Sequence, residues 1–188
     1  MSYLVLILGV ALWSAAHLFK RIAPARRAAM GDAGKGFVAV LSLAAIGLMV
    51  LGYRWAEPVP VYAPLPGAGH LTALLMLVAV FLLGVGGTRG VLYPRLRHPM
   101  LTGALLWAVA HLLVNGDLRA IILFGGLGLW SVVAMLAINR AGPWTVPADG
   151  RGLRGDAMNL AGTLVVYGLI VLVHQWILGH SLFAGTYG

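Results

Sequence analysis

The sequence predicts an all-α membrane protein, a single domain of about six transmembrane helices that spans residues 1–188. Of these residues, 61% are hydrophobic and only 10% are charged, whereas about a quarter of the residues of an ordinary soluble domain are charged. The apolar residues also form long runs and do not alternate with polar residues as they do in soluble proteins. A surface of this composition needs lipid as its solvent.

Six segments approach the roughly 20 apolar residues that a membrane-spanning helix needs, with about 17 as the lower limit. In chain order, the predicted helices cover residues 3–22, 36–53, 70–87, 99–114, 118–138 and 157–178. The first is expected to be retained, because it has no basic segment in front and Lys20 and Arg21 follow it directly, unlike a signal peptide. The fourth is the shortest, and the Asn-Gly-Asp sequence at 115–117 turns it sharply into the fifth.

The charges of the connecting loops predict the orientation of the chain. The loops after the first, third and fifth helices hold five, three and three Lys and Arg residues, and the opposite side has only Arg54 and Arg119. Cytoplasmic loops collect Lys and Arg, so both termini are expected to face away from the cytoplasm. Orientation also accounts for the net charge of +8. Nucleic acid is not an expected partner, since its readers need a basic face with polar support.

The missing residue types narrow the chemistry. The chain has no cysteine, which excludes disulfides, thiolate-held zinc and iron–sulfur clusters. Paired-carboxylate catalysis is poorly supported, because the acidic residues are expected in loops or turns: Asp32, Glu57, Asp117, Asp149 and Asp156. The ionisable side chains predicted inside the membrane are therefore histidines, and such residues are functional candidates.

Two histidines occur in matching sequences, Leu-Trp-Ser-Ala-Ala-His-Leu ending at Leu18 and Leu-Trp-Ala-Val-Ala-His-Leu ending at Leu112. Trp13 and Trp107 each precede a histidine, His17 or His111, by one helical turn on the same helix face. Two imidazoles from separate helices suit six-coordinate haem iron, and a Trp-lined pocket suits the apolar porphyrin. The alternative is a pair of structural histidines that bond to neighbouring helices.

The expected depths of these two ligands differ. His17 is predicted near the cytoplasmic end of its helix and His111 near the outer end, a mismatch of roughly 10 to 15 Å. A porphyrin lying nearly flat, or helices at unequal depths, would bridge it, and His174 is the best substitute ligand. His98 is a further substitute, although its place before Pro99 favours a basic interfacial entry to the fourth helix. Arg95 or Arg97 is expected to pair with the haem propionates.

These residues resemble those of the NnrU family of bacterial membrane proteins. The resemblance is carried by His17 with its basic loop, by Arg-His-Pro-Met-Leu at 97–101, and above all by Ala-His-Leu-Leu-Val-Asn-Gly-Asp at 110–117. It implies an inner-membrane protein of nitrite and nitric oxide metabolism in denitrification. That family is similar to the 15-cis-zeta-carotene isomerases, membrane enzymes whose haem b is held at the positions of His17 and His111.

Three functions therefore stand open: a haem b protein of redox or nitric oxide metabolism, a haem-dependent cis-trans isomerase of a polyene, and a cofactor-free assembly or transport factor. The expected partners are membrane lipid and a hydrophobic substrate or nitric oxide. Arg-His-Pro is also similar to the isoprenylcysteine carboxyl methyltransferases, which bind S-adenosylmethionine. Those enzymes carry an acidic signature further on, whereas residues 139–156 contain no Glu, so methyl transfer is not expected.

Overall fold

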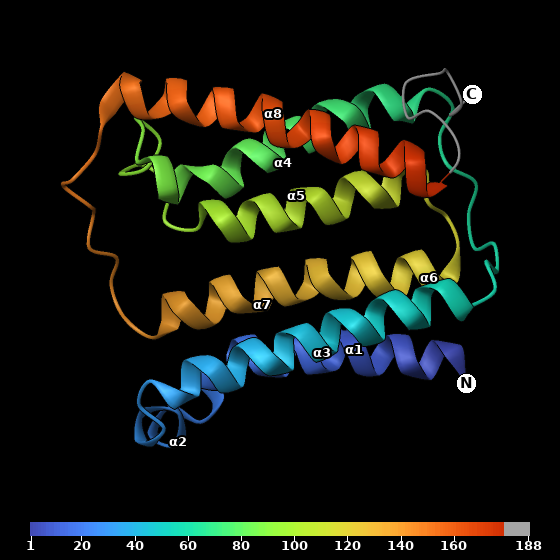
Figure 1. Ribbon diagram of the computed structural model, residues 1–188, viewed down its shortest axis with the longest axis horizontal. Helices are drawn as coiled ribbons and strands as arrows, with labels where there is room; N and C mark the ends of the chain where they lie inside the picture. Colours follow the sequence, from blue (N-terminus) through green and yellow to red (C-terminus); the bar gives the residue numbers. More distant parts are fainter. Residues whose placement is uncertain (179–188) are drawn as a thin grey trace. The chain divides into compact units, whose positions relative to one another are not determined.

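The computed structural model describes residues 1–178, and it is helical, as the sequence predicts. In chain order the elements are α1 (Ser2–Ile22), α2 (Pro24–Ala29), α3 (Ala33–Trp55), α4 (Ala68–Thr88), α5 (Pro99–Val114), α6 (Leu118–Ala120), the π-helical segment η1 (Ile121–Gly125), α7 (Gly126–Arg140) and α8 (Gly152–Leu178) (Figure 1). Within the described residues, five helices are long and apolar enough to cross a membrane: α1, α3, α4, the continuous helix Leu118–Arg140, and α8. The sixth predicted span, α5, has 16 residues and is apolar. The polytopic helical fold class is confirmed.

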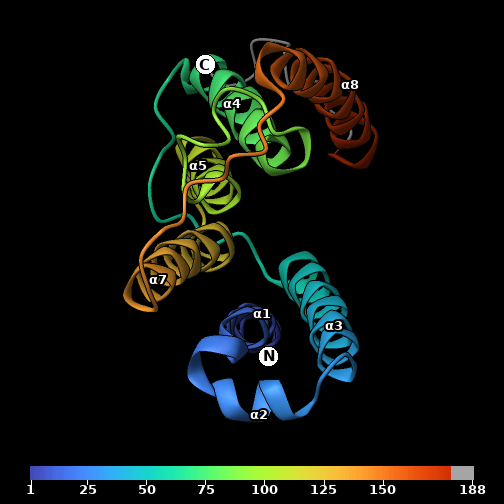
Figure 2. The same ribbon diagram turned by 90° about the vertical axis from the view of Figure 1, so that its left-hand side faces the viewer.

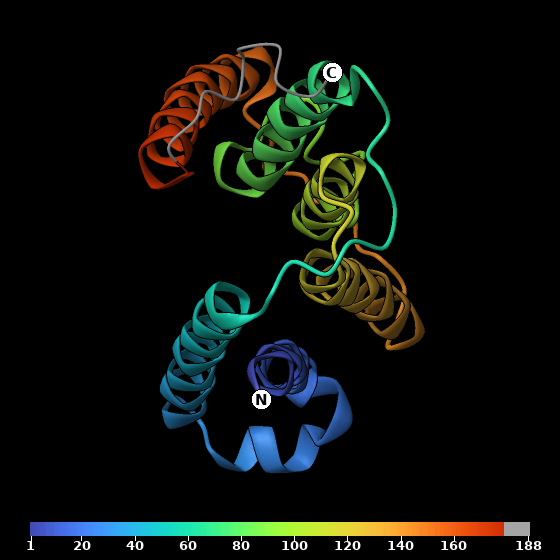
Figure 3. The ribbon, with the colours of Figure 1, turned by 90° about the vertical axis from the view of Figure 1, so that its right-hand side faces the viewer.

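The helices belong to two compact units. Unit 1 contains Met1–Tyr62 and Gly116–Gly142, and unit 2 contains Ala63–Asn115 and the chain from Pro143 onward. In unit 1, α1 runs beside α3, and the short α2 links their ends (Figure 2). In unit 2, α4 lies between α5 and α8 (Figure 3). The prediction of a single transmembrane domain stays a prediction.

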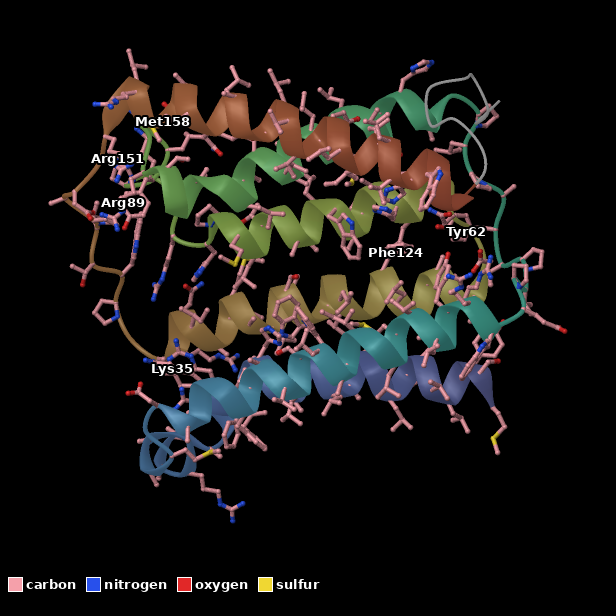
Figure 4. All side chains as sticks on the ribbon, in the orientation of Figure 1. Lys35, Tyr62, Arg89, Phe124, Arg151 and Met158 are labelled. Atoms are coloured by element: carbon pink, nitrogen blue, oxygen red, sulfur yellow. The ribbon has the colours of Figure 1, made fainter. Side chains whose placement is uncertain are left out.

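Each unit has one basic end. In unit 1, six of the eight Lys and Arg residues lie in the last turn of α1, in α2, at the start of α3 or at the end of α7: Lys20, Arg21, Arg26, Arg27, Lys35 and Arg140. In unit 2, the basic residues of the described chain all lie where α4 ends and where α5 and α8 begin: Arg89, Arg95, Arg97, Arg151 and Arg154. Figure 4 shows Arg89 and Arg151 close together, and the Arg151 N–H donates to the Arg89 carbonyl over 2.6 Å. The charge asymmetry predicted from the loops is thus present within each unit.

The start of α8 differs from its prediction. The helix begins at Gly152, five residues before the predicted 157, so Asp156 lies in a helix and not in a loop. Its two carboxylate oxygens each accept the Val91 N–H at 3.1 Å. This contact anchors a polar first turn of α8 against the end of α4. A prediction from apolar runs misses such a turn, because it detects only the hydrocarbon-spanning part of a helix.

Helices α1 and α3 approach each other so closely that glycine is required on both. A side chain at Gly9 would lie 2.7 Å from the Met49 nitrogen of α3, and one at Gly52 would lie 2.6 Å from the Leu6 Cα of α1. Leu6 itself is fully buried. Small residues drive helix association in membranes because they let backbones approach and gain van der Waals contact. The pair α1–α3 is therefore the tightly packed centre of unit 1.

Polar side chains tie the helices of unit 2 together. The Asn159 amide of α8 donates to the Phe81 carbonyl of α4 over 2.9 Å, and the Tyr167 hydroxyl donates to the Ala73 carbonyl over 3.1 Å. The Thr72 hydroxyl of α4 donates to the Ala110 carbonyl of α5 over 3.1 Å. Interhelical hydrogen bonds stabilise membrane bundles, since an unpaired polar group in hydrocarbon is costly.

Replacing Asn159 tests this link. Asn159→Leu removes a hydrogen bond from a side chain that is 3% exposed, and it is expected to lower the free energy of unfolding by about 0.6 to 1.7 kcal/mol. Thr163 is the control, since its buried hydroxyl, one turn further along α8, has no hydrogen-bond partner within the described chain. Thr163→Val is expected to be neutral or stabilising. Reversible unfolding in mixed detergent micelles measures both, and an equal loss in the two variants would contradict the link.

The turn that follows α5 is hydrogen-bonded to the proline-rich loop that follows α3. The Gly116 carbonyl accepts N–H groups from Val61 at 2.8 Å and Tyr62 at 3.1 Å, and the Leu118 N–H donates to Val59 over 2.8 Å. Asp117 caps the next helix by accepting the Ala120 N–H at 2.9 Å. A side chain at Gly116 would collide with the Tyr62 carbonyl oxygen. Residues 115–117 thus separate α5 from α6, and Gly116 and Leu118 hold the loop through backbone hydrogen bonds.

Candidate functional site

His17 lies in unit 1 within a small aromatic cluster. Its ring stacks on Trp13 with centroids 3.9 Å apart, and its Nδ1 lies 2.9 Å from the Trp13 carbonyl oxygen. Trp130 of α7 meets both rings edge-on, at 5.6 Å from Trp13 and 5.3 Å from His17. The predicted Trp–His pair is therefore in contact, and Trp130 is a third member that the sequence analysis missed.

Two buried polar atoms of this cluster have no hydrogen-bond partner in the described part of the chain. The indole nitrogens of Trp13 and Trp130 are buried and make no hydrogen bond within the described residues. A buried indole N–H normally finds an acceptor, so these two donors are available to a bound group. Trp130 follows the π-helical segment η1 in the same continuous helix. Such segments inside α-helices often occur at functional sites.

His111 lies in unit 2, near the end of α5. Its Nδ1 is 2.9 Å from the Trp107 carbonyl oxygen, and the two rings are 4.9 Å apart. The nearby ring of His174, from α8, has its centroid 6.5 Å from that of His111. The Nδ1 of His174 lies 2.9 Å from the Ile170 carbonyl oxygen. Unit 2 thus brings together the predicted ligand His111 and its predicted substitute His174.

The three histidines share one local hydrogen-bond arrangement. In each, Nδ1 faces the carbonyl oxygen four residues earlier, at 2.9 Å. A carbonyl oxygen only accepts, so Nδ1 carries the proton and Nε2 carries the lone pair of the neutral ring. A backbone carbonyl bonded to the other ring nitrogen is the usual support of a metal-bound imidazole, because it fixes the tautomer and the ring orientation.

The pairing of His17 with His111 stays a prediction, because the two residues belong to different units. Within its own unit, His17 lies near the basic end, whereas His111 lies far from the basic end of unit 2. Two further residues of the haem prediction, His98 and Arg97, can be compared with His111 because all three belong to unit 2. His98 and Arg97 stand at the start of α5, about 20 Å from His111 along the helix axis. This distance argues against one iron shared by His98 and His111, and the pairing of Arg97 with the haem propionates stays a prediction.

Clusters of three or more metal-binding side chains from His, Asp and Glu do not occur in residues 1–178. A metal held by this part of the chain would therefore rely on fewer protein ligands.

Comparisons with known proteins identify a family. The family model described as NnrU protein matches residues 5–182, which is most of the chain. No curated protein and no solved structure matches this chain. The similarity to the 15-cis-zeta-carotene isomerases therefore stays a prediction.

Proposed function

Because the chain belongs to the NnrU protein family, we propose that it is an integral membrane protein that binds haem b and acts in redox chemistry linked to nitrite and nitric oxide. We further propose a bacterial inner membrane with both termini in the periplasm. The single basic end of each unit supports this orientation, since Lys and Arg collect on the cytoplasmic side.

The observation that carries the haem proposal is the neighbouring pair His111 and His174. Imidazole nitrogens are common ligands of iron, and two rings that lie near each other could hold one metal ion. The centroids of His111 and His174 are 6.5 Å apart. In the neutral tautomer that donates from Nδ1 to the backbone carbonyl, the lone pair of each ring is on Nε2. The pair would therefore hold the haem iron through its two imidazoles.

The surrounding residues hold these ligands in place. Asn115 binds the His111 carbonyl twice, through its backbone N–H at 2.9 Å and its side-chain amide at 2.8 Å, and so fixes the last turn of α5. The ring of Trp107 provides an apolar surface next to His111, as the sequence analysis expects for a porphyrin pocket. When bound, a haem with two imidazole ligands supplies one-electron redox chemistry at a potential that its ligands and its burial set.

His17 is the other choice for the second ligand. The matching Trp-x-x-x-His sequences favour it, and its tautomer is the same as that of His111. The buried indole N–H groups of Trp13 and Trp130 next to it are also suited to a polar ligand. Variants of each histidine separate the two possibilities.

The test is the absorption spectrum of the full chain, purified in mild detergent from haem-replete cells. The wild type is expected to show a b-type Soret band that His111→Ala abolishes. His174→Ala is expected to shift the band to that of a five-coordinate haem, while His98→Ala, on the same helix as His111, leaves it unchanged.

Two other results are informative. A shift in His17→Ala with none in His174→Ala would replace His174 by His17 as the second ligand. Colourless wild-type protein, or an unchanged band in His111→Ala, would overturn the haem proposal, and colourless protein in a stable complex with another membrane subunit would favour an assembly factor.

A further inference from the structure

The connection between α1 and α3 carries the densest positive charge of unit 1. We call residues 20–35 the basic connection; it comprises the last turn of α1, the whole of α2 and the start of α3. It holds one acidic residue, Asp32, and five basic residues: Lys20, Arg21, Arg26, Arg27 and Lys35. Orientation explains why such charges lie on the cytoplasmic side, but it does not say what they contact there.

Most of this positive charge has no counter-charge within the described chain. Asp32 pairs with Lys35 at 2.7 Å. The other four basic side chains form no ion pair with any of residues 1–178. Arg27 donates an N–H to the Gly31 carbonyl over 2.9 Å, but a neutral carbonyl leaves the charge of the guanidinium uncompensated. The basic connection is therefore complemented by an anion from outside the described residues.

The basic connection also exposes an apolar side chain among its charges. Lys20, Arg21 and Arg26 are exposed, and Ile22, which ends α1, is 70% exposed. Segments that lie at a membrane surface combine cations, which reach the headgroups, with apolar side chains, which contact the acyl chains. This combination favours a lipid surface over a soluble anion as the partner.

The shortness of the basic connection keeps its charges near the membrane. Only residues 23–32 separate α1 from α3, and both helices are long and apolar enough to cross a membrane. The two helices run side by side, and α2 lies at the end where α1 finishes and α3 starts (Figure 1). Figure 4 shows Lys35 at this same end. The basic side chains therefore lie at the level of the lipid headgroups.

We infer that the basic connection binds the headgroups of anionic phospholipids through four side chains: Lys20, Arg21, Arg26 and Arg27. Clusters of about four to eight Lys and Arg residues immediately beside a membrane helix bind such headgroups, because the negative surface potential of the lipid attracts them. A zwitterionic lipid has no net charge and gains little from this attraction. The inference goes beyond the proposed function and does not depend on haem.

The test is native mass spectrometry of the full chain in detergent with equal amounts of phosphatidylglycerol and phosphatidylcholine. The wild type is expected to retain phosphatidylglycerol preferentially. Arg26→Gln is expected to reduce this preference about fivefold, which corresponds to about 1 kcal/mol for one charge near the membrane surface. Arg26→Lys keeps the charge and is expected to keep the preference. Arg54→Gln is the matched control, because Arg54 is an exposed arginine at the other end of α3.

Circular dichroism and gel filtration establish that each variant is folded, and Arg21→Gln decides the matter if Arg26→Gln is not. Equal retention of the two lipids by the wild type would overturn the inference. So would an equal loss in Arg26→Gln and Arg54→Gln, which would show that the net charge of the chain matters and not the basic connection. A wild type that binds a short single-stranded DNA and shows no lipid preference would assign the basic connection to a soluble polyanion instead.

Discussion

A Gly52→Leu variant is expected to unfold more easily than the wild type, with a loss at the upper end of the range of about 1 to 3 kcal/mol typical of overpacked cores. The Cβ alone would lie 2.6 Å from the Leu6 Cα and 2.8 Å from its Cβ. Backbone atoms cannot rotate away as a side chain can, so α1 and α3 must separate along their shared length. The separation removes the close contacts that hold a membrane helix pair together.

Gly47→Leu is the matched control. Gly47 lies on the same helix, and a side chain there would meet nothing within 4 Å. The change exchanges glycine for a better helix former at an open position, so the free energy of unfolding is expected to stay the same or rise. Reversible unfolding in mixed micelles, followed by circular dichroism, compares the two variants. If both lose the same amount, the close crossing of α1 and α3 is wrong.

The sequence predicted the helices because the membrane imposes a simple rule, a long apolar run for each span. Predicted and observed ends agree within a few residues, and α5 agrees at both ends. The exceptions are α2 and the first turn of α8. Both are polar helical turns outside the hydrocarbon, where apolar periodicity carries no signal.

In the candidate site, only the contacts between residues close together in the sequence could be predicted. The Trp-x-x-x-His spacing predicts the contacts of His17 with Trp13 and of His111 with Trp107, since residues four apart share a helix face. It cannot identify Trp130, which reaches His17 from a distant helix. The π-helical segment η1 also shifts the phase of the helix before Trp130, and regular α-helical spacing does not anticipate such a shift.

The sequence predicts that glycines let helices pack closely, but it does not predict which glycines do so. The glycines at 125, 126 and 128 look like a close-packing stretch, and Gly126 does face Val10, whose Cγ1 would lie 2.7 Å from an added Cβ. The close crossing of α1 and α3 is instead made by Gly9 and Gly52, neither of which has another glycine within four residues in the sequence. An isolated glycine in an apolar run has no sequence pattern that distinguishes a packed position from a lipid-facing one such as Gly47.

Among the polar side chains of unit 1, Arg119 is expected to contribute most to the stability of the end where the proline-rich loop is bonded to Gly116 and Leu118. Its guanidinium donates to the Ala56 carbonyl over 3.2 Å and to the Tyr53 carbonyl over 3.5 Å, both at the end of α3. It also lies 4.7 Å from the centre of the Tyr53 ring and 3.5 Å from an Asp117 oxygen. The last carbonyls of a helix have no partner within the helix, and the positive charge is favourable there.

Arg119→Gln removes the charge, the ring contact and the ion pair together, and about 2 kcal/mol of the free energy of unfolding is expected to be lost. Arg54→Gln is the control, because Arg54 is an exposed arginine in the last turn of α3, the helix whose end Arg119 binds. Surface changes of this kind stay within about 0.5 kcal/mol. Limited proteolysis gives a second readout: the loop from Glu57 to Tyr62 is expected to be cut faster in Arg119→Gln alone. Equal cleavage of the two variants would show that Gly116 and Asp117 hold the loop without Arg119.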